Sequence, residues 1–136
     1  MQENKTELIL ETHQLSKTFK GQHAVNGISL HIPDCSIYGL LGPNGAGKST
    51  TIRSIMNLIN KTSGKVLIEN KEFNKDDIET KEKIGYLPSE IHLYDDLTVK
   101  EMLDYHESFY KKDIHNRRIE LVKMLQLDEK KKIEDL

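Results

Sequence analysis

The sequence has one cysteine, three prolines and no long apolar run, and each shortage excludes a class of protein. Cys35 cannot form a disulfide within the chain and has no second cysteine with which to build a thiolate metal site. No apolar stretch approaches the roughly 18 residues that span a bilayer, and the polar opening from Met1 to Glu7 lacks the regions of a secretory signal. We therefore expect a cytosolic protein that reaches a membrane only through a partner.

The charges of the sequence are nearly balanced. Its 20 lysine and arginine residues and 22 aspartate and glutamate residues give a formal net charge of −2. Nucleic-acid binders usually carry a concentrated basic surface, and the run from Lys130 to Lys132 is most simply a solvated helix end. With 36% hydrophobic and 31% charged residues, the composition is typical of a folded domain. We expect no nucleic-acid partner, and any phosphate recognition must be local.

Five short segments have the apolar pattern of β-strands. Apolar side chains alternate or cluster along residues 7–12 and 27–32, which predicts half-buried strands. Residues 36–41 form a mostly apolar run between turn residues, which predicts a strand buried on both faces of a sheet. Residues 65–69 and 84–87 predict two further short strands.

Helical patterns follow in the same chain. Apolar residues at the i, i+3, i+4, i+7 spacing predict a helix over about residues 48–58. Residues 98–101 have the form of a capping box and precede apolar residues at near-helical spacing, and a further helix is predicted over residues 116–127. Strands that alternate with helices indicate an α/β fold.

A complete phosphate-loop motif lies between the predicted strand at residues 36–41 and the first predicted helix. The pattern G-x-x-x-x-G-K-S/T is met in full. Small residues let the backbone curl so that successive N–H groups point inward, and the helix N-terminus adds partial positive charge. The eight residues of the motif are Gly42, Pro43, Asn44, Gly45, Ala46, Gly47, Lys48 and Ser49.

This motif predicts roles for three side chains at the start of the helix. Lys48 is expected to contact the β- and γ-phosphates, and the Ser49 hydroxyl to ligate a Mg²⁺ ion. Thr50 is a candidate donor to the α-phosphate. The motif indicates binding of a nucleoside triphosphate and by itself specifies no reaction.

The sequence around this loop resembles the Walker A region of ATP-binding-cassette (ABC) ATPases over residues 40–51. Residues 15–19 and 24–29 resemble the opening segment of that family, in which an aromatic residue stacks on adenine. The resemblance places Phe19 at the adenine position, where a flat π-face supports affinity without reading the edge of the base. Val25 is a candidate apolar wall beside the ring.

Further along, residues 84–88 resemble the approach to the family's Q-loop. The glutamine of that loop is replaced here by Ser89, and Glu90 follows. The resemblance makes both candidate catalytic residues, and an exposed polar loop is an equally weighted alternative. Residues 93–99 and the helices beyond resemble the helical subdomain, which in exporters of this family presses against the transmembrane subunits.

The resemblance implies an α/β fold of the P-loop NTPase class and ABC ATPase type. We expect the antiparallel β subdomain and P-loop core over about residues 1–88, and the Q-loop region with the start of the helical subdomain over about residues 89–136. The family's signature motif, Walker B aspartate, adjoining glutamate and switch histidine are expected beyond Leu136. The chain is therefore expected to be the N-terminal part of a nucleotide-binding domain, with weak ATP binding, negligible hydrolysis and poor solubility on its own.

The leading hypothesis for function is the ATPase subunit of an ABC transporter that couples ATP hydrolysis to export. It implies ATP and Mg²⁺ as cofactors, a transmembrane permease and a second ABC ATPase subunit as partners, and a location at the inner face of the cell membrane. Alternatives are a soluble ABC protein of translation or DNA repair, and a nucleotide-binding remnant without activity. A small-molecule kinase or GTPase is a further hypothesis that would need its own lid or a guanine-reading motif, and we expect no Asn-Lys-x-Asp guanine motif.

Overall fold

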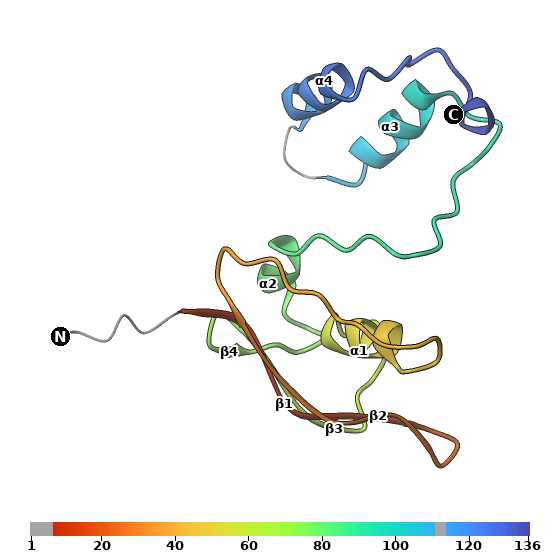
Figure 1. The fold of residues 1–136 in the computed structure, drawn as a ribbon. Helices are drawn as coiled ribbons and strands as arrows, with labels where there is room; N and C mark the ends of the chain where they lie inside the picture. Colours follow the sequence, from red (N-terminus) through yellow and green to blue (C-terminus); the bar gives the residue numbers. More distant parts are fainter. Residues whose placement is uncertain (1–6, 111–113) are drawn as a thin grey trace. The chain divides into compact units, whose positions relative to one another are not determined.

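The computed structural model describes residues 7–110 and 114–136, which form two compact units (Figure 1). Unit 1 ends at Gly85 and unit 2 begins at Tyr86. The sequence-based division near residue 88 stays a prediction.

Unit 1 is built on a four-stranded antiparallel sheet (Figure 1). The strands are β1 (Leu8–Phe19), β2 (Gln22–Pro33), β3 (Ser63–Ile68) and β4 (Lys71–Glu72), in the order β2-β1-β3-β4. A two-residue turn at Lys20 and Gly21 joins β1 to β2, and both residues have positive φ, as a tight hairpin requires. The strands predicted at residues 7–12, 27–32 and 65–69 are therefore confirmed, and the first two are longer than predicted.

The core of unit 1 lies between this sheet and the helix α1 (Lys48–Ile55). The predicted helix over residues 48–58 is confirmed, although it ends three residues earlier. Apolar side chains of the sheet and helix pack together, and Thr12 is buried beside them with its hydroxyl donating to the Ile28 carbonyl at 2.9 Å. The buried apolar cluster consists of Leu15, Ile55, Val66, Ile68 and Phe73.

Two predicted strands do not form. Residues 36–41 and 84–87 have no regular secondary structure, and Ile37 and Leu41 are 104% and 93% exposed. A strand depends on hydrogen bonds to a neighbouring strand, and the described residues place no strand beside either segment. Residues 36–41 are mostly apolar, as the prediction required, but their side chains lie at the surface in this structure.

A short helix, α2 (Ile78–Glu82), was not predicted. Asp77 is its N-cap, and the Asp77 carboxylate accepts hydrogen bonds from the Thr80 backbone N–H at 3.0 Å and the Thr80 hydroxyl at 2.7 Å. None of the five residues of α2 is buried, so the cap rather than apolar periodicity marks its start.

Unit 2 contains α3 (Val99–Glu107), α4 (His115–Met124) and a single 3₁₀ turn, η1 (Ile133–Asp135). The predicted capping box is confirmed, because Thr98 and Glu101 exchange hydrogen bonds at the start of α3. The helix predicted over residues 116–127 is present as α4, within three residues at each end. The C-terminal segment returns to α3, and the Ile133 backbone N–H donates to the Leu97 carbonyl at 2.9 Å.

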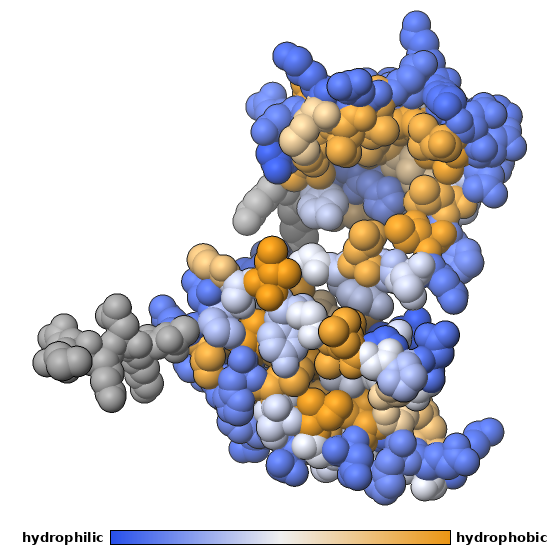
Figure 2. All heavy atoms as spheres, viewed as in Figure 1, coloured by the Kyte–Doolittle hydropathy of each residue, from blue (hydrophilic) through white to orange (hydrophobic). Residues whose placement is uncertain are grey.

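Apolar side chains lie at the surface of both units (Figure 2). In the part of the chain that the structure describes, no helix has the length and apolar character to cross a membrane.

Candidate functional site

The phosphate-loop motif forms an exposed loop that leads directly into α1. A turn within it is closed by the Ala46 backbone N–H, which donates to the Pro43 carbonyl at 3.2 Å. Gly45 and Gly47 have φ values of 81° and 87°, in the left-handed region that favours glycine. A β-carbon added at Gly47 would lie 2.1 Å from the Ala24 carbonyl oxygen of β2. Glycine at this position therefore permits both the backbone conformation and the close approach of loop to sheet.

The N-terminus of α1 opens toward a hollow in front of the loop. Gly47 is the N-cap residue and supplies no side-chain cap, and the first turn contains no acidic residue. Because the first N–H groups of a helix have no partner within the helix, this end attracts an anion. The hollow has a volume of about 280 Å³ and is lined by Ala24, Asn44, Gly45, Gly47, Lys48, Ser49 and Thr50.

Lys48 holds the two sides of the loop together. Its ammonium donates to the Gly42 carbonyl at 2.7 Å and to the Pro43 carbonyl at 2.8 Å. A full positive charge therefore lies at the edge of the hollow, bound to neutral acceptors. Next to it, Ser49 is exposed and Thr50 is half-buried. Both hydroxyl-bearing residues line the same hollow.

The two candidate adenine residues lie on the hairpin of unit 1 in different environments. Phe19 is 47% exposed at the end of β1, so part of its ring is open to a ligand. Val25 is 3% exposed, and its Cγ2 would lie 3.7 Å from a β-carbon at Gly47. Val25 thus packs against the base of the loop instead of presenting a free apolar wall.

Ser89 and Glu90 belong to unit 2, in an exposed bend after Pro88. Phe19, Val25 and the loop all belong to unit 1. The structure brings Val25 against Gly47 of the loop, and Phe19 belongs to the same unit without being among the residues that line the hollow. The catalytic roles of Ser89 and Glu90 stay predictions.

Two residues that the sequence did not single out lie at this site. Ala24 lines the hollow, and its carbonyl faces Gly47. Lys17 places its ammonium nitrogen 4.6 Å from the centroid of the Phe19 ring. The second contact had a signal in the sequence, because residues two apart on a strand share a face.

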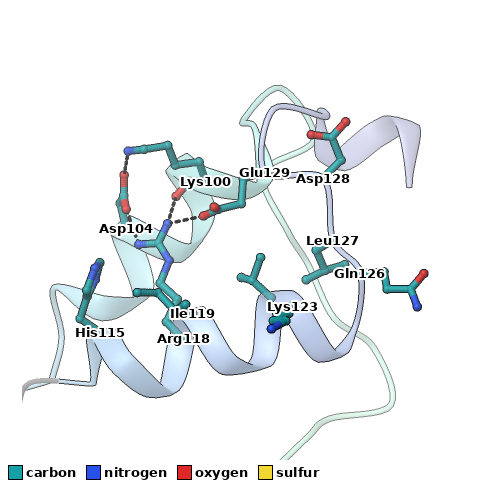
Figure 3. Close-up of a pocket in the computed structure, with 11 residues that line it drawn as sticks. Lys100, Asp104, His115, Arg118, Ile119, Lys123, Gln126, Leu127, Asp128 and Glu129 are labelled. Atoms are coloured by element: carbon teal, nitrogen blue, oxygen red, sulfur yellow. Dashed lines mark hydrogen bonds and ion pairs between the residues drawn. The ribbon is translucent and has the colours of Figure 1, made fainter.

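A larger hollow, of about 730 Å³, lies in unit 2 and is lined by charged side chains (Figure 3). Arg118 is one of the residues that line it, and its side chain is 10% exposed. It donates to the carboxylates of Asp104, Glu107 and Glu129, the last two at 2.9 Å each. These hydrogen bonds, the first of them to Asp104, raise the pKa of Arg118. Arg118 and these carboxylates satisfy one another, so this part of the hollow is a partly exposed ion-pair network.

The prediction that the sequence lacks a guanine motif was wrong. We expected no guanine motif, yet Asn74-Lys75-Asp76-Asp77 matches Asn-Lys-x-Asp. The carboxylate of Asp77, which would have to read the base, is engaged as the N-cap of α2. The hydrogen bonds from Thr80 lower its pKa. The match is thus explained by helix capping.

A nucleoside triphosphate with Mg²⁺ fits the residues of the loop. The missing β-carbon at Gly47 lets the loop lie close against β2, the uncapped end of α1 offers N–H donors, and Lys48 supplies the charge. The exposed Ser49 hydroxyl is an oxygen donor of the kind that Mg²⁺ prefers.

Comparison with known proteins agrees with this geometry. A family model described as ABC transporter matches residues 25–135. The chain belongs to the ABC transporter ATPase family. The sequence resemblance and the predicted fold class are thereby confirmed, and members of this ABC family are ATP-hydrolysing enzymes.

Relatives within the ABC family include two proteins of Bacillus subtilis (strain 168). The ABC transporter ATP-binding protein YcbN is 35% identical over 90% of this chain and 41% of its own length. The SkfA peptide export ATP-binding protein SkfE is 34% identical over 90% of this chain and 52% of its own length. The chain therefore spans about half or less of these curated relatives.

Solved ABC structures share the fold. A putative ABC transporter ATP-binding protein from Pyrococcus furiosus superposes with a TM-score of 0.74 and 26% identity, covering 93% of this chain and 62% of its own. A dimeric ATP-binding cassette bound to ADP and Pi superposes with a TM-score of 0.72 and 26% identity, with the same coverage.

Proposed function

We propose that this chain binds ATP with Mg²⁺ at the loop of residues 42–50, as part of the ATPase subunit of an ABC exporter. One observation carries the proposal above all others. The loop, its two left-handed glycines and the uncapped end of α1 surround a single hollow with Lys48 at its edge. A flexible anion with several phosphates is the ligand that this arrangement matches.

Each residue of the loop has a role in this proposal. Lys48 leaves the Gly42 and Pro43 carbonyls and contacts the β- and γ-phosphates. The backbone N–H groups of residues 45–49 surround the β-phosphate, and Thr50 donates to the α-phosphate. Ser49 holds Mg²⁺, which supplies charge that shields the phosphate oxygens.

The base occupies the hairpin side of the site in the same proposal. Adenine stacks on the exposed face of Phe19, and Val25 supports the loop from below. Stacking of this kind contributes affinity with little selectivity among purines.

Export through a permease is the finer part of the proposal. The relatives named for SkfA peptide export and for linearmycin resistance support it. The partners are a transmembrane permease and a second ABC ATPase subunit, and the location is the inner face of the cell membrane. In sequence, Ser89 or Glu90 occupies the place of the family's Q-loop glutamine and is a candidate catalytic residue, and an exposed polar loop is the equally weighted alternative.

The first experiment measures equilibrium binding of a fluorescent ATP analogue with Mg²⁺ to the 136-residue chain and to Lys48→Ala. We expect at least a tenfold weaker affinity in the variant, because a charge-assisted contact to phosphate contributes about 1.5–3 kcal/mol. Lys20→Ala, which removes an exposed lysine of the hairpin turn, is the matched control. Equal affinity of Lys48→Ala and the unmodified chain would disprove the site.

Hydrolysis is tested in the same samples. The sequence has no LSGGQ-type signature, and phosphoryl transfer depends on positioned charge around an oriented water. We expect no measurable phosphate release from the chain alone. Mg²⁺-dependent turnover that Lys48→Ala abolishes would contradict this expectation.

A further inference from the structure

One face of the Phe19 ring is already occupied within unit 1. The ammonium of Lys17 lies 4.6 Å from the ring centroid, within the range of a cation–π contact. Since 47% of Phe19 remains exposed, part of the ring is still open to a ligand. A planar base that approaches the ring can therefore stack only where the ammonium is absent.

The position of the Lys17 ammonium is fixed by a second contact. It donates to the Asn60 carbonyl at 2.6 Å, and Asn60 lies in the segment that follows α1. The same segment is tied to β1 by the Thr62 backbone N–H, which donates to the Ser16 carbonyl at 2.8 Å, and by the Thr62 hydroxyl, which accepts from the Thr18 N–H at 2.9 Å. The aromatic end of β1 is thus joined to the residues after the helix that begins at the phosphate loop.

From these contacts we propose that Lys17 is a positioning residue for the purine of the nucleotide. It acts through Phe19, and the inference rests on the proposed function of the site. The ammonium holds the ring in one orientation and reserves its opposite face for adenine. It also draws π-electron density toward itself, which reduces the repulsion between the ring and the electron-rich face of a stacked purine.

The proposal separates the base from the phosphates, and so does its test. The affinities of the 136-residue chain for Mg²⁺-ATP and for inorganic tripolyphosphate are measured for the unmodified chain and for Lys17→Met. The methionine keeps a linear apolar side chain and removes the charge. We expect the Kd for ATP to rise about two- to fivefold, the size of a cation–π contact at an exposed site, while the Kd for tripolyphosphate stays constant.

Two further variants show whether Lys17 acts through the ring. Lys17→Arg retains a cation over the ring and should keep the affinity for ATP close to that of the unmodified chain. In a Phe19→Leu background, Lys17→Met should have no further effect, because the ring on which the ammonium acts is gone. Lys20→Met removes an exposed charge from the adjacent turn and is expected to change neither affinity.

Several outcomes would overturn the proposal. Equal weakening of ATP and tripolyphosphate binding by Lys17→Met would show general attraction of anions or a damaged fold. An unchanged Kd for ATP would show that the ammonium has no effect on the base. Thermal unfolding without nucleotide monitors the fold, and Lys17→Gln, which keeps an amide donor, replaces Lys17→Met if that variant unfolds.

Failure of the proposed function gives a different result. In that case Lys48→Ala leaves ATP binding unchanged, or the unmodified chain binds no ATP. If binding depends on Lys48 and is insensitive to Lys17→Met, the site stands and only the positioning role is lost.

Discussion

The two units of this chain are held together by different interactions. Unit 1 has a buried apolar cluster and a sheet whose strands pair along most of their length. Among the residues of unit 2 that the structure describes, the buried apolar side chains are Val99 and Met102, and the nearly buried guanidinium of Arg118 joins α3, α4 and Glu129. The first unit has the larger cluster of buried apolar side chains, and the described part of the second adds a network of hydrogen-bonded charges to its own buried pair.

This difference bears on where a binding site can be placed. The phosphate loop needs backbone positions fixed to fractions of an ångström, as the contact of Gly47 with the Ala24 carbonyl illustrates. A sheet supplies that precision because each strand is fixed by its neighbours. Unit 2 depends on a few charged side chains, and we expect it to respond more strongly to changes of charge and pH.

The largest expected effect concerns the close contact in unit 1. Gly47→Ala introduces a β-carbon 2.1 Å from the Ala24 oxygen at a residue whose φ is 87°. Strain and overpacking should together lower the stability of unit 1 by about 2–4 kcal/mol. Hydrogen exchange of the β1 and β3 amides measures this change, and ATP binding should be lost with it.

The control for this variant is Gly21→Ala. Gly21 also has a positive φ, 84°, but no atom lies within 4 Å of the position of its β-carbon. Only the backbone cost of about 1 kcal/mol is expected. If both variants were equally stable, the contact between loop and sheet would have no energetic importance.

In unit 2, the next largest effect follows from Arg118→Met. The change leaves Asp104, Glu107 and Glu129 without their shared cation. Solvent screens these partly exposed carboxylates, so we expect a loss of about 2 kcal/mol in the stability of α3 and α4. Hydrogen exchange of the α4 amides should quicken while the amides of unit 1 are unaffected.

Arg117→Met tests whether position matters more than charge. Arg117 is 62% exposed and pairs with Glu120 on the helix surface. Its removal should cost under about 0.5 kcal/mol. A loss as large as that of Arg118→Met would mean that net charge, and not the network, stabilises unit 2.

A smaller effect is expected at the start of α3. Thr98→Ala removes the hydroxyl that accepts from the Glu101 backbone N–H at 3.2 Å, and so opens the capping box. The expected cost is about 1 kcal/mol, visible as faster exchange in the first turn of α3. Asn116→Ala, on the exposed surface of α4, is the control and should be close to neutral. Unchanged exchange in the first turn would show that the cap adds nothing to the network.

The smallest effect concerns acid. Hydrogen bonds from the Thr98 backbone N–H and hydroxyl lower the pKa of Glu101, and hydrogen bonds from Lys100 and Arg118 lower the pKa of Asp104. A carboxyl with a lowered folded-state pKa adds stability above its unfolded pKa of about 4, and this stability is lost as pH falls through the folded value. Unit 2 should therefore weaken on acidification below about pH 4.

Glu101→Gln sharpens this test, because glutamine keeps a capping box without the titrating charge. Amide exchange of α3 measured between pH 5 and pH 2 should show a shallower pH dependence in this variant. An identical pH dependence would assign the acid response to other carboxyls.

The local elements could be predicted from the sequence, because their signals lie within a few residues of one another. The capping box at Thr98 and Glu101, and the helix after the phosphate loop, are of this kind. The predictions of strands at residues 36–41 and 84–87 were wrong. An apolar run indicates only that burial is favourable, and a strand also needs a neighbouring strand to pair with.

In the candidate site, too, local features could be predicted from the sequence and contacts between distant residues could not. The motif predicted the residues that line the hollow, apart from Ala24, since they are contiguous and their backbone geometry is local. Ala24 meets the loop through a contact that depends on how the sheet is folded, whereas the contact of Lys17 with Phe19 follows from their i, i+2 spacing on one strand. The carboxylates that accept from Arg118 lie 11 to 14 residues away in sequence, too far for any spacing rule to identify.

The hydrogen bonds of Lys48 to its own loop have a thermodynamic consequence. A phosphate that arrives does not meet an unsatisfied ammonium, because the Gly42 and Pro43 carbonyls already accept from it. In the proposed complex, ligand binding at Lys48 exchanges two neutral acceptors for anionic ones, so the measured affinity reports the difference between two satisfied states. The enthalpy of binding should accordingly be less favourable than the number of new phosphate contacts implies. The Gly42 and Pro43 carbonyls, once released by Lys48, must accept hydrogen bonds from water instead.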